Sequence, residues 1–185
     1  MKKYKFTGET KTIYLPFGTV TLHRIKAVVE FGLVKVGDLG GRIEKEENLS
    51  HEENAWVYGD AEVCGNAWVC GNAEVRGNAK VYGDAEVRGN AWVCGNAWVC
   101  GNAKVFSTDH VLVIGAIGSR NDFTTFFRDK DNEITVKCGC FLGKIDKFLE
   151  KVTQTHKDTK HTLAYRTAVE VAKLQIDLTE KSTRR

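Results

Sequence analysis

The sequence has little proline, no long hydrophobic run and almost no net charge. Pro16 is the only proline among 185 residues, which excludes a Pro-rich linker. No apolar run approaches the ~20 residues that a membrane-spanning helix needs. Lys and Arg number 27 against 24 Asp and Glu, so the net charge of +3 gives no support to binding of nucleic acid or of a membrane surface. We therefore expect neither a membrane nor a nucleic-acid partner.

The chain also lacks an apolar stretch behind its basic N-terminus, Met1 to Phe6, and this excludes a secretory signal there. The six cysteines are then expected to be reduced thiols in a cytoplasmic protein. Hydrophobic residues make up 42% of the chain and charged residues 28%, a balance typical of a folded globular protein.

A six-residue repeat fills the middle of the chain, from Asn54 to Ser107. Nine consecutive units read Asn or Asp, Ala, any residue, Val, any residue and then Gly, with Ser in the ninth. Ala and Val share one face of a strand because side chains alternate, and Gly followed by Asn or Asp favours a corner. A helix is excluded because residues six apart do not stay on one face of a helix that has 3.6 residues per turn. The pattern predicts a three-sided prism with about 18 residues per coil, and so three coils.

This pattern resembles the hexapeptide-repeat proteins, which are left-handed parallel β-helices. Bactofilin-like polymer-forming proteins use a similar repeat with right-handed coils, so the handedness stays open. The lead-in Gly37 to Ser50 (GDLGGRIEKEENLS) and the later segment Gly118 to Phe141 resemble uncharacterised hexapeptide-repeat proteins of phages and prophages. That resemblance implies an accessory protein of a mobile element, and the family has no agreed activity to transfer.

The predicted fold class is mainly β, a single-stranded parallel β-helix with two caps. Residues 1–53 are expected to form an N-terminal β cap and lead-in, 54–107 the β-helix, and 108–185 a C-terminal α/β cap. In the N-terminal cap we expect strands at residues 4–6, 11–15 and 19–29. In the C-terminal cap we expect strands at 111–117, 122–128 and 133–137, followed by helices at 143–155 and 160–178. The basic end, Lys181 to Arg185, is interpreted as a solvated terminus.

Residues 18 apart should stack on neighbouring coils. The three outer columns are Trp56–Glu74–Trp92, Glu62–Lys80–Trp98 and Trp68–Glu86–Lys104, which predicts ion pairs between coils and amide ladders at the Asn corners. A monomer seldom leaves large aromatic residues exposed in columns on a flat face. Either neighbouring side chains or a flanking segment cover them, or they lie in a homo-oligomer interface, or they form a stacking platform for a ligand or nucleobase. The candidate binding aromatics are Trp56, Tyr58, Trp68, Trp92 and Trp98.

The cysteines of the repeat are expected to be free thiols, since no two lie 18 residues apart on adjacent coils. Cys138 and Cys140 are interpreted as core thiols of the cap. Alternatives are a zinc site with His156 and His161, or a catalytic thiol with a histidine base. The corner from Ser119 to Asp122 is interpreted as a turn, and the alternative is an anion site formed by Arg120 and Arg128.

Three functions remain open. The first is a non-enzymatic binding or scaffold protein that forms a dimer or trimer and needs no cofactor. Its partner would be another protein, and if the chain belongs to a mobile element, that partner would be a component of the host's defence. The second is a hexapeptide-type acyltransferase that uses acetyl-coenzyme A, with His51 or His110 as the base because the repeat contains no histidine. The third is a polymer-forming structural protein, which the sizeable caps oppose.

Overall fold

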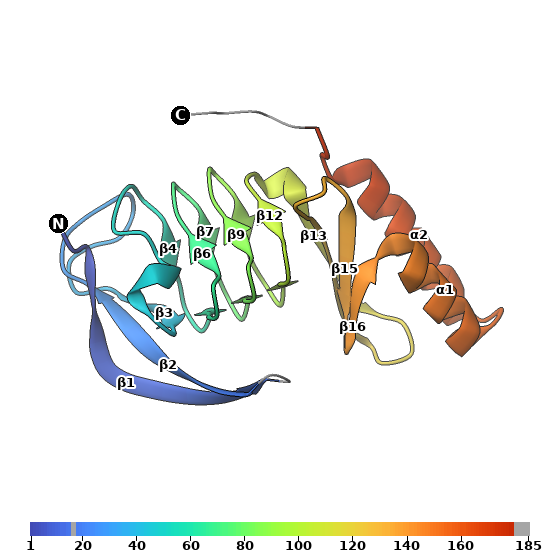
Figure 1. Cartoon of the computed structure of the whole chain (residues 1–185), viewed down its shortest axis with the longest axis horizontal. Helices are drawn as coiled ribbons and strands as arrows, with labels where there is room; N and C mark the ends of the chain where they lie inside the picture. The colour runs from blue at the N-terminus through green and yellow to red at the C-terminus, as the bar shows by residue number, and fades with distance from the viewer. Residues whose placement is uncertain (16–17, 180–185) are drawn as a thin grey trace.

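The computed structural model describes residues 1–15 and 18–179. The chain forms four parts in a row: an N-terminal β-hairpin, a β-solenoid, a four-stranded sheet and a pair of helices (Figure 1). The terminal segment Lys181 to Arg185, expected to be solvated, lies outside the described residues. None of the helices in the described part of the chain combines the length and apolarity that a membrane span requires.

The repeat forms the solenoid, with one two-residue strand in each of its nine units. Each strand of the first two coils pairs in parallel with the strand 18 residues further on, as in Trp56 with Glu74 and Glu74 with Trp92. This confirms the predicted three-sided coils and all three outer columns. The strands are β4 (Trp56–Val57), β5 (Glu62–Val63), β6 (Trp68–Val69), β7 (Glu74–Val75), β8 (Lys80–Val81), β9 (Glu86–Val87), β10 (Trp92–Val93), β11 (Trp98–Val99) and β12 (Lys104–Val105).

The Ala and Val of every unit point inward, and all are at most 1% exposed. Backbone amides donate to carbonyls of the next coil, for example Trp56 N to Ala73 O at 3.0 Å. The predicted amide ladders form at the corners, where Asn54 donates to Asn72 at 2.9 Å and Asn72 to Asn90 at 3.2 Å. The solenoid therefore combines a thin apolar core with hydrogen bonds along its whole length.

The lead-in forms an incomplete coil ahead of the nine units. β3 (Leu39–Ile43) pairs in parallel with β5, and Leu49, which follows the 3₁₀ helix η1 (Glu46–Asn48), forms a parallel bridge with Val69. The two glycines of β3 lie where no side chain fits. A methyl group at Gly40 would lie 2.7 Å from the Trp56 ring, and one at Gly41 would lie 2.5 Å from a backbone oxygen. Close packing thus explains the Gly-Gly pair of the lead-in.

The N-terminal segment differs from its prediction as three short strands. It forms two long antiparallel strands, β1 (Tyr4–Leu15) and β2 (Gly18–Ala27), with one irregularity between Phe6 and Thr10. β2 continues the sheet through β3, so the order is β1-β2-β3-β5-β8-β11. The hairpin curves beneath the solenoid (Figure 1) and covers the outer side of Glu62, which is 3% exposed.

The C-terminal sheet has the order β13-β14-β15-β16. The predicted strands 111–117 and 122–128 are confirmed as β13 (Val111–Ile117) and β14 (Asp122–Arg128), and the third is β15 (Ile134–Cys138). β13 was expected to be buried and is half-buried, with an exposed end at Gly115 and Ala116. The helix expected from Gly143 is wrong at its start, because Gly143 pairs with Val136 in a fourth strand, β16 (Phe141–Lys144).

Two helices cover the far side of this sheet, α1 (Ile145–His156) and α2 (Lys160–Gln175). Their predicted apolar stripes are buried, including Phe148 and Val169. The sheet separates two cores, because neighbouring side chains of β14 point to opposite sides. Phe127 completes the solenoid core, whereas Phe126 belongs to the helical core. The sheet is therefore at once the plug of the solenoid and the base of the helices.

Candidate functional site

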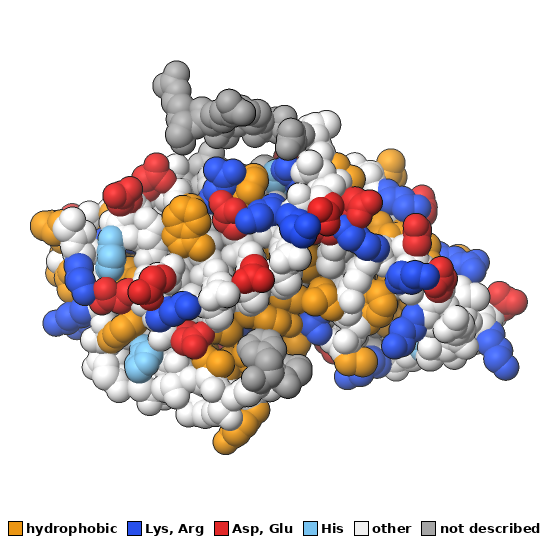
Figure 2. Space-filling model, viewed as in Figure 1, with side chains coloured by type: hydrophobic (Ala, Val, Ile, Leu, Met, Phe, Trp, Pro, Cys, Tyr) orange, Lys and Arg blue, Asp and Glu red, His pale blue; other side chains and the backbone are white. Residues whose placement is uncertain are grey.

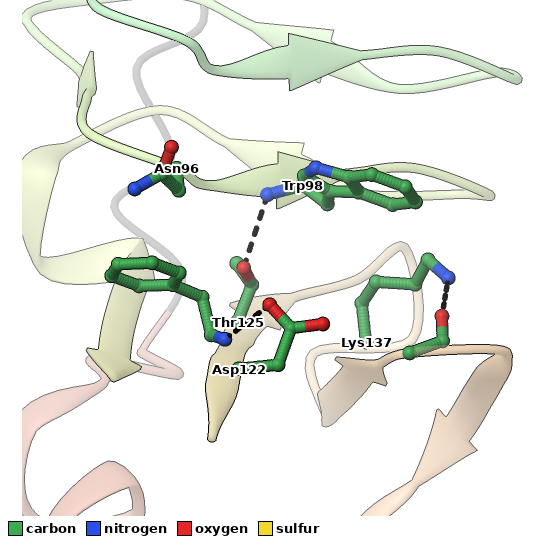
Figure 3. A pocket seen from close by; sticks show the side chains of 7 residues that line it. Asn96, Trp98, Asp122, Thr125 and Lys137 are labelled. Carbon is green, nitrogen blue, oxygen red and sulfur yellow. Dashed lines mark hydrogen bonds between the residues drawn. The ribbon is translucent and has the colours of Figure 1, made fainter. Parts of the chain in front are cut away.

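A crevice of about 280 Å³ lies where the last coil of the solenoid meets the C-terminal sheet. Asn96 and Trp98 form its solenoid wall (Figure 3). The opposite wall comes from the two central strands of the sheet and the turn that follows them. Its residues are Asp122, Phe123, Thr125, Lys137 and Gly139. The crevice thus joins two parts of the chain that fold around separate cores.

Thr125 fixes the two walls together. In every earlier coil the residue at the Trp98 position donates its amide to the following coil, but no coil follows β11 in this sheet. The Trp98 amide donates instead to the Thr125 hydroxyl at 3.0 Å (Figure 3). Unpaired strand edges invite association with other chains, and here the hydroxyl satisfies the amide. Trp98 is therefore held at a defined position beside the sheet.

Two lysine ammonium groups flank the Trp98 ring. Lys80 Nζ, from the preceding coil, lies 5.1 Å from the ring centroid, and Lys137 Nζ, from β15, lies 4.7 Å from it. Lys137 also donates a hydrogen bond to the Gly139 carbonyl. Tyr82 meets the ring edge-on at 6.4 Å. Cation–π contacts of this kind stabilise the ring orientation by about 0.5–1 kcal/mol each at exposed sites.

The crevice combines apolar and charged groups at an accessible surface. Trp98 and Phe123 are each 37% exposed, and Asp122, whose carboxylate accepts from the Phe123 amide at 2.7 Å, is exposed beside them. Figure 2 shows hydrophobic side chains gathered beneath the solenoid, next to the hairpin. Exposed aromatic rings bordered by cations and a carboxylate suit binding by packing and ion pairing. The seven side chains contain no pairing of a nucleophile with a base.

The other candidate aromatics lie apart from this crevice. Trp68 and Trp92 are 45% and 52% exposed on the other two sides of the prism. Tyr58 is half-buried beneath the Arg76 guanidinium, 4.5 Å from the ring centroid. For Trp56 the explanation by cover from a flanking segment holds, so its candidacy as a binding residue is wrong. It is 1% exposed because Phe31, 5.3 Å away between ring centroids, and Tyr4, at 6.1 Å, pack on it.

The two candidate histidines stand at opposite ends of the solenoid and both have structural contacts. His51 accepts from the Lys3 amide at 3.2 Å and stacks on Tyr4. His110 ends the 3₁₀ helix η2 (Thr108–His110), is 3% exposed and accepts from the Phe106 amide at 3.1 Å. Burial lowers the pKa of both imidazoles. Neither histidine lines the crevice, so neither can act as the base for acyl transfer there.

Arg120 and Arg128 do not form the anion site that their spacing suggested. Arg120 lies in the turn before β14, and Arg128 is the last residue of that strand and is 5% exposed. Its guanidinium donates to the Asn132 side-chain oxygen and lies 3.4 Å from the His110 ring nitrogens. Arg120, by contrast, is exposed at the turn between β13 and β14. Arg128 is thus part of the join between solenoid and sheet.

The interpretation as core thiols is wrong for Cys140, which is exposed, whereas Cys138 is half-buried and packs against the helical core. His156 lies near them across a cavity in the helical cap, and its ring centroid is 5.8 Å from that of His161. Within residues 1–15 and 18–179, no group of three or more His, Cys, Asp or Glu side chains is placed to hold a metal ion. All six cysteines are free thiols, as predicted for the repeat.

Sequence analysis identified Trp98 but missed its neighbours. Phe123, Thr125 and Lys137 alternate with residues of the helical core along β14 and β15, so their strand periodicity places them on one face. The sequence therefore predicts that these residues share a face of the sheet. It does not predict what that face packs against, because no pattern within β14 or β15 indicates contact with the end of the solenoid.

No protein-family model and no curated protein matches this chain.

Proposed function

We propose that this protein acts by binding a protein partner at the crevice between the last solenoid coil and the C-terminal sheet. The observation that carries the proposal is the fixed, partly exposed Trp98, held by Thr125 and bordered by Phe123, Lys80 and Lys137. Tryptophan is among the residues most enriched where partners bind tightly. A side chain that is already ordered loses little entropy when it is covered.

The crevice indicates the chemistry of the partner. The exposed rings of Trp98 and Phe123 favour a segment that offers an apolar or aromatic side chain. The two lysines orient the Trp98 ring, because Lys137 already donates to the Gly139 carbonyl and Lys80 already lies 3.6 Å from Glu62. The resemblance of the lead-in and of Gly118 to Phe141 to phage-borne proteins supports a host protein as the partner, in the bacterial cytoplasm. Left-handed coiling and membership of that phage-borne kind are part of the same proposal.

Site-specific cross-linking tests this proposal. The full chain carries benzoylphenylalanine in place of Phe123, is expressed in bacteria and is irradiated. We expect a defined cross-linked protein whose yield falls at least tenfold in Trp98→Ala. The matched control is Leu163→Ala, which removes an exposed apolar side chain of α2, outside the crevice and outside the tryptophan faces. No cross-link in the chain that keeps Trp98, or equal loss in both variants, would overturn the proposal.

We also propose that the chain assembles with copies of itself through the remaining tryptophan faces. Trp68 and Trp92 are the evidence, because each is an exposed indole on a flat side of the prism. Native mass spectrometry should give a dimer or trimer that Trp92→Ala or Trp68→Ala weakens, whereas Trp98→Ala leaves it intact. A monomer at micromolar concentration would exclude assembly and leave the crevice proposal standing.

A further inference from the structure

The C-terminal cap contains a second cavity, of about 200 Å³, on the helix side of the sheet. Its floor is aromatic. Phe148, from α1, meets Phe141 at 5.3 Å and Tyr165 at 5.4 Å between ring centroids. Gly118 allows this packing, since a methyl group there would lie 2.0 Å from the Tyr165 hydroxyl. The floor therefore offers an apolar surface of the size of a single ring.

The rim of this cavity is cationic. Arg120, from the β13–β14 turn, and Lys151, from α1, both line it and both are exposed. Neither forms an ion pair with any carboxylate in the described part of the chain. The Arg120 guanidinium lies against the Cys138–Cys140 turn, because a methyl group at Gly139 would be 3.2 Å from one of its nitrogens. That nitrogen is Nη1, and no hydrogen bond from Arg120 to another described residue competes for its donors.

Polar groups complete the rim. His156 Nε2 lies 3.5 Å from the Ser119 hydroxyl, and the imidazole stacks near Tyr165 at 6.0 Å between ring centroids. Burial raises the pKa of the Tyr165 phenol to about 12, so that ring stays neutral and adds no negative charge. The combination of aromatic floor and two available cations is the pattern of a small-ligand site with a few polar groups that fix orientation.

We propose that this cavity binds a small organic carboxylate with an aromatic body. The carboxylate would pair with Arg120, whose planar guanidinium suits bidentate contact, and with Lys151. The ring would lie on Phe141, Phe148 and Tyr165. The cavity is on the opposite face of the sheet from the Trp98 crevice, so this proposal does not rest on the protein-binding function.

Cys140 supplies the measurement because its exposed thiol lines the cavity. The rate of alkylation of Cys140 by iodoacetamide is followed by mass spectrometry, with and without phenylacetate. Cys94, an exposed thiol of the solenoid, is the internal control. We expect saturable protection of Cys140 by at least fivefold, no change at Cys94, and no protection by phenylacetamide, which lacks the charge.

Variants decide which groups hold the anion. Arg120→Gln and Lys151→Gln should each weaken protection at least tenfold, whereas Lys147→Gln, on the same helix but outside the cavity, should not. Far-UV circular dichroism checks that the cap remains folded. Equal protection by inorganic phosphate would overturn the aromatic part of the proposal. Absence of protection, or protection that Arg120→Gln and Lys151→Gln both leave unchanged, would overturn the site itself.

Discussion

Trp56 and Trp92 occupy the same position in nearly identical repeat units, yet they have different surroundings. Both stack on Glu74 in one column, from opposite sides. Trp56 is 1% exposed under the N-terminal cap, and Trp92 is 52% exposed. The repeat determines which way a side chain points, whereas a distant segment determines whether it is covered.

This pair gives a matched test of stability. Trp56→Ala should lower the free energy of unfolding by about 3–5 kcal/mol, because it empties a packed site between Phe31, Tyr4 and β3. Trp92→Ala should change it by less than about 1 kcal/mol at concentrations where the chain is monomeric, because the ring is 52% exposed and packs under Arg76. Urea denaturation followed by circular dichroism measures both. Similar values for the two variants would contradict the cover that we describe for Trp56.

The buried thiols of the repeat predict an alkaline pH dependence. Burial raises the pKa of Cys64 and of Cys70 to about 11, against about 9 for an unburied thiol. The unfolded chain then loses these protons first, so the stabilisation is complete below pH about 9 and is lost as the pH rises through about 11. Unfolding free energies measured from pH 8 to 11 should fall less steeply in Cys64→Ala than in the wild type. Identical slopes would show that this thiol does not titrate differently on folding.

At the scale of elements, the hairpin is tied to the solenoid by a buried carboxylate. Glu62 is 3% exposed beneath the hairpin, and Lys11 of β1 approaches its Oε1 at 2.6 Å. Lys80 of the next coil lies 3.6 Å from Oε2. A buried carboxylate is costly unless it is paired.

Lys11→Ala should therefore destabilise the protein by about 1–2 kcal/mol, a value reduced from that of a fully buried pair because the Lys11 side chain is half exposed. The hairpin amides should also exchange faster with solvent. Lys5→Ala is the control, because Lys5 is an exposed lysine of the same strand. Hydrogen exchange with mass spectrometry gives the local result, and unchanged exchange in the hairpin of Lys11→Ala would show that this ion pair does not hold it.

The sequence alone predicted some of the elements and missed others. Six-residue spacing was sufficient for the coils, columns and amide ladders, because each depends on contacts between residues at a constant separation. β16 was missed because its four residues contain Gly143 and run directly into α1. The crevice at Trp98 and the cavity at Arg120 depend on contacts between distant segments, such as Trp98 with Thr125, and no local pattern specifies them.

At the scale of the whole molecule, the C-terminal sheet contributes side chains to both cores. Phe127 packs with the valines of the solenoid, and Phe126 packs with Phe148 of α1. The same sheet covers one end of the solenoid, while β3, η1 and the hairpin cover the other (Figure 1). Covered ends oppose the addition of another molecule to the terminal coils.

We therefore expect one cooperative unfolding transition and no filaments. Phe127→Ala and Phe148→Ala alter different cores, but each should lower the midpoint of the same calorimetric transition, because the shared sheet cannot unfold with one core alone. Phe148→Ala should leave the ends of the solenoid covered. The sedimentation coefficient should therefore not increase with protein concentration in either the wild type or this variant. Two separate transitions would show that the cap is an independent domain. Filaments of the wild-type protein in electron micrographs would show that its capped ends still associate, and would favour the polymer-forming alternative over binding.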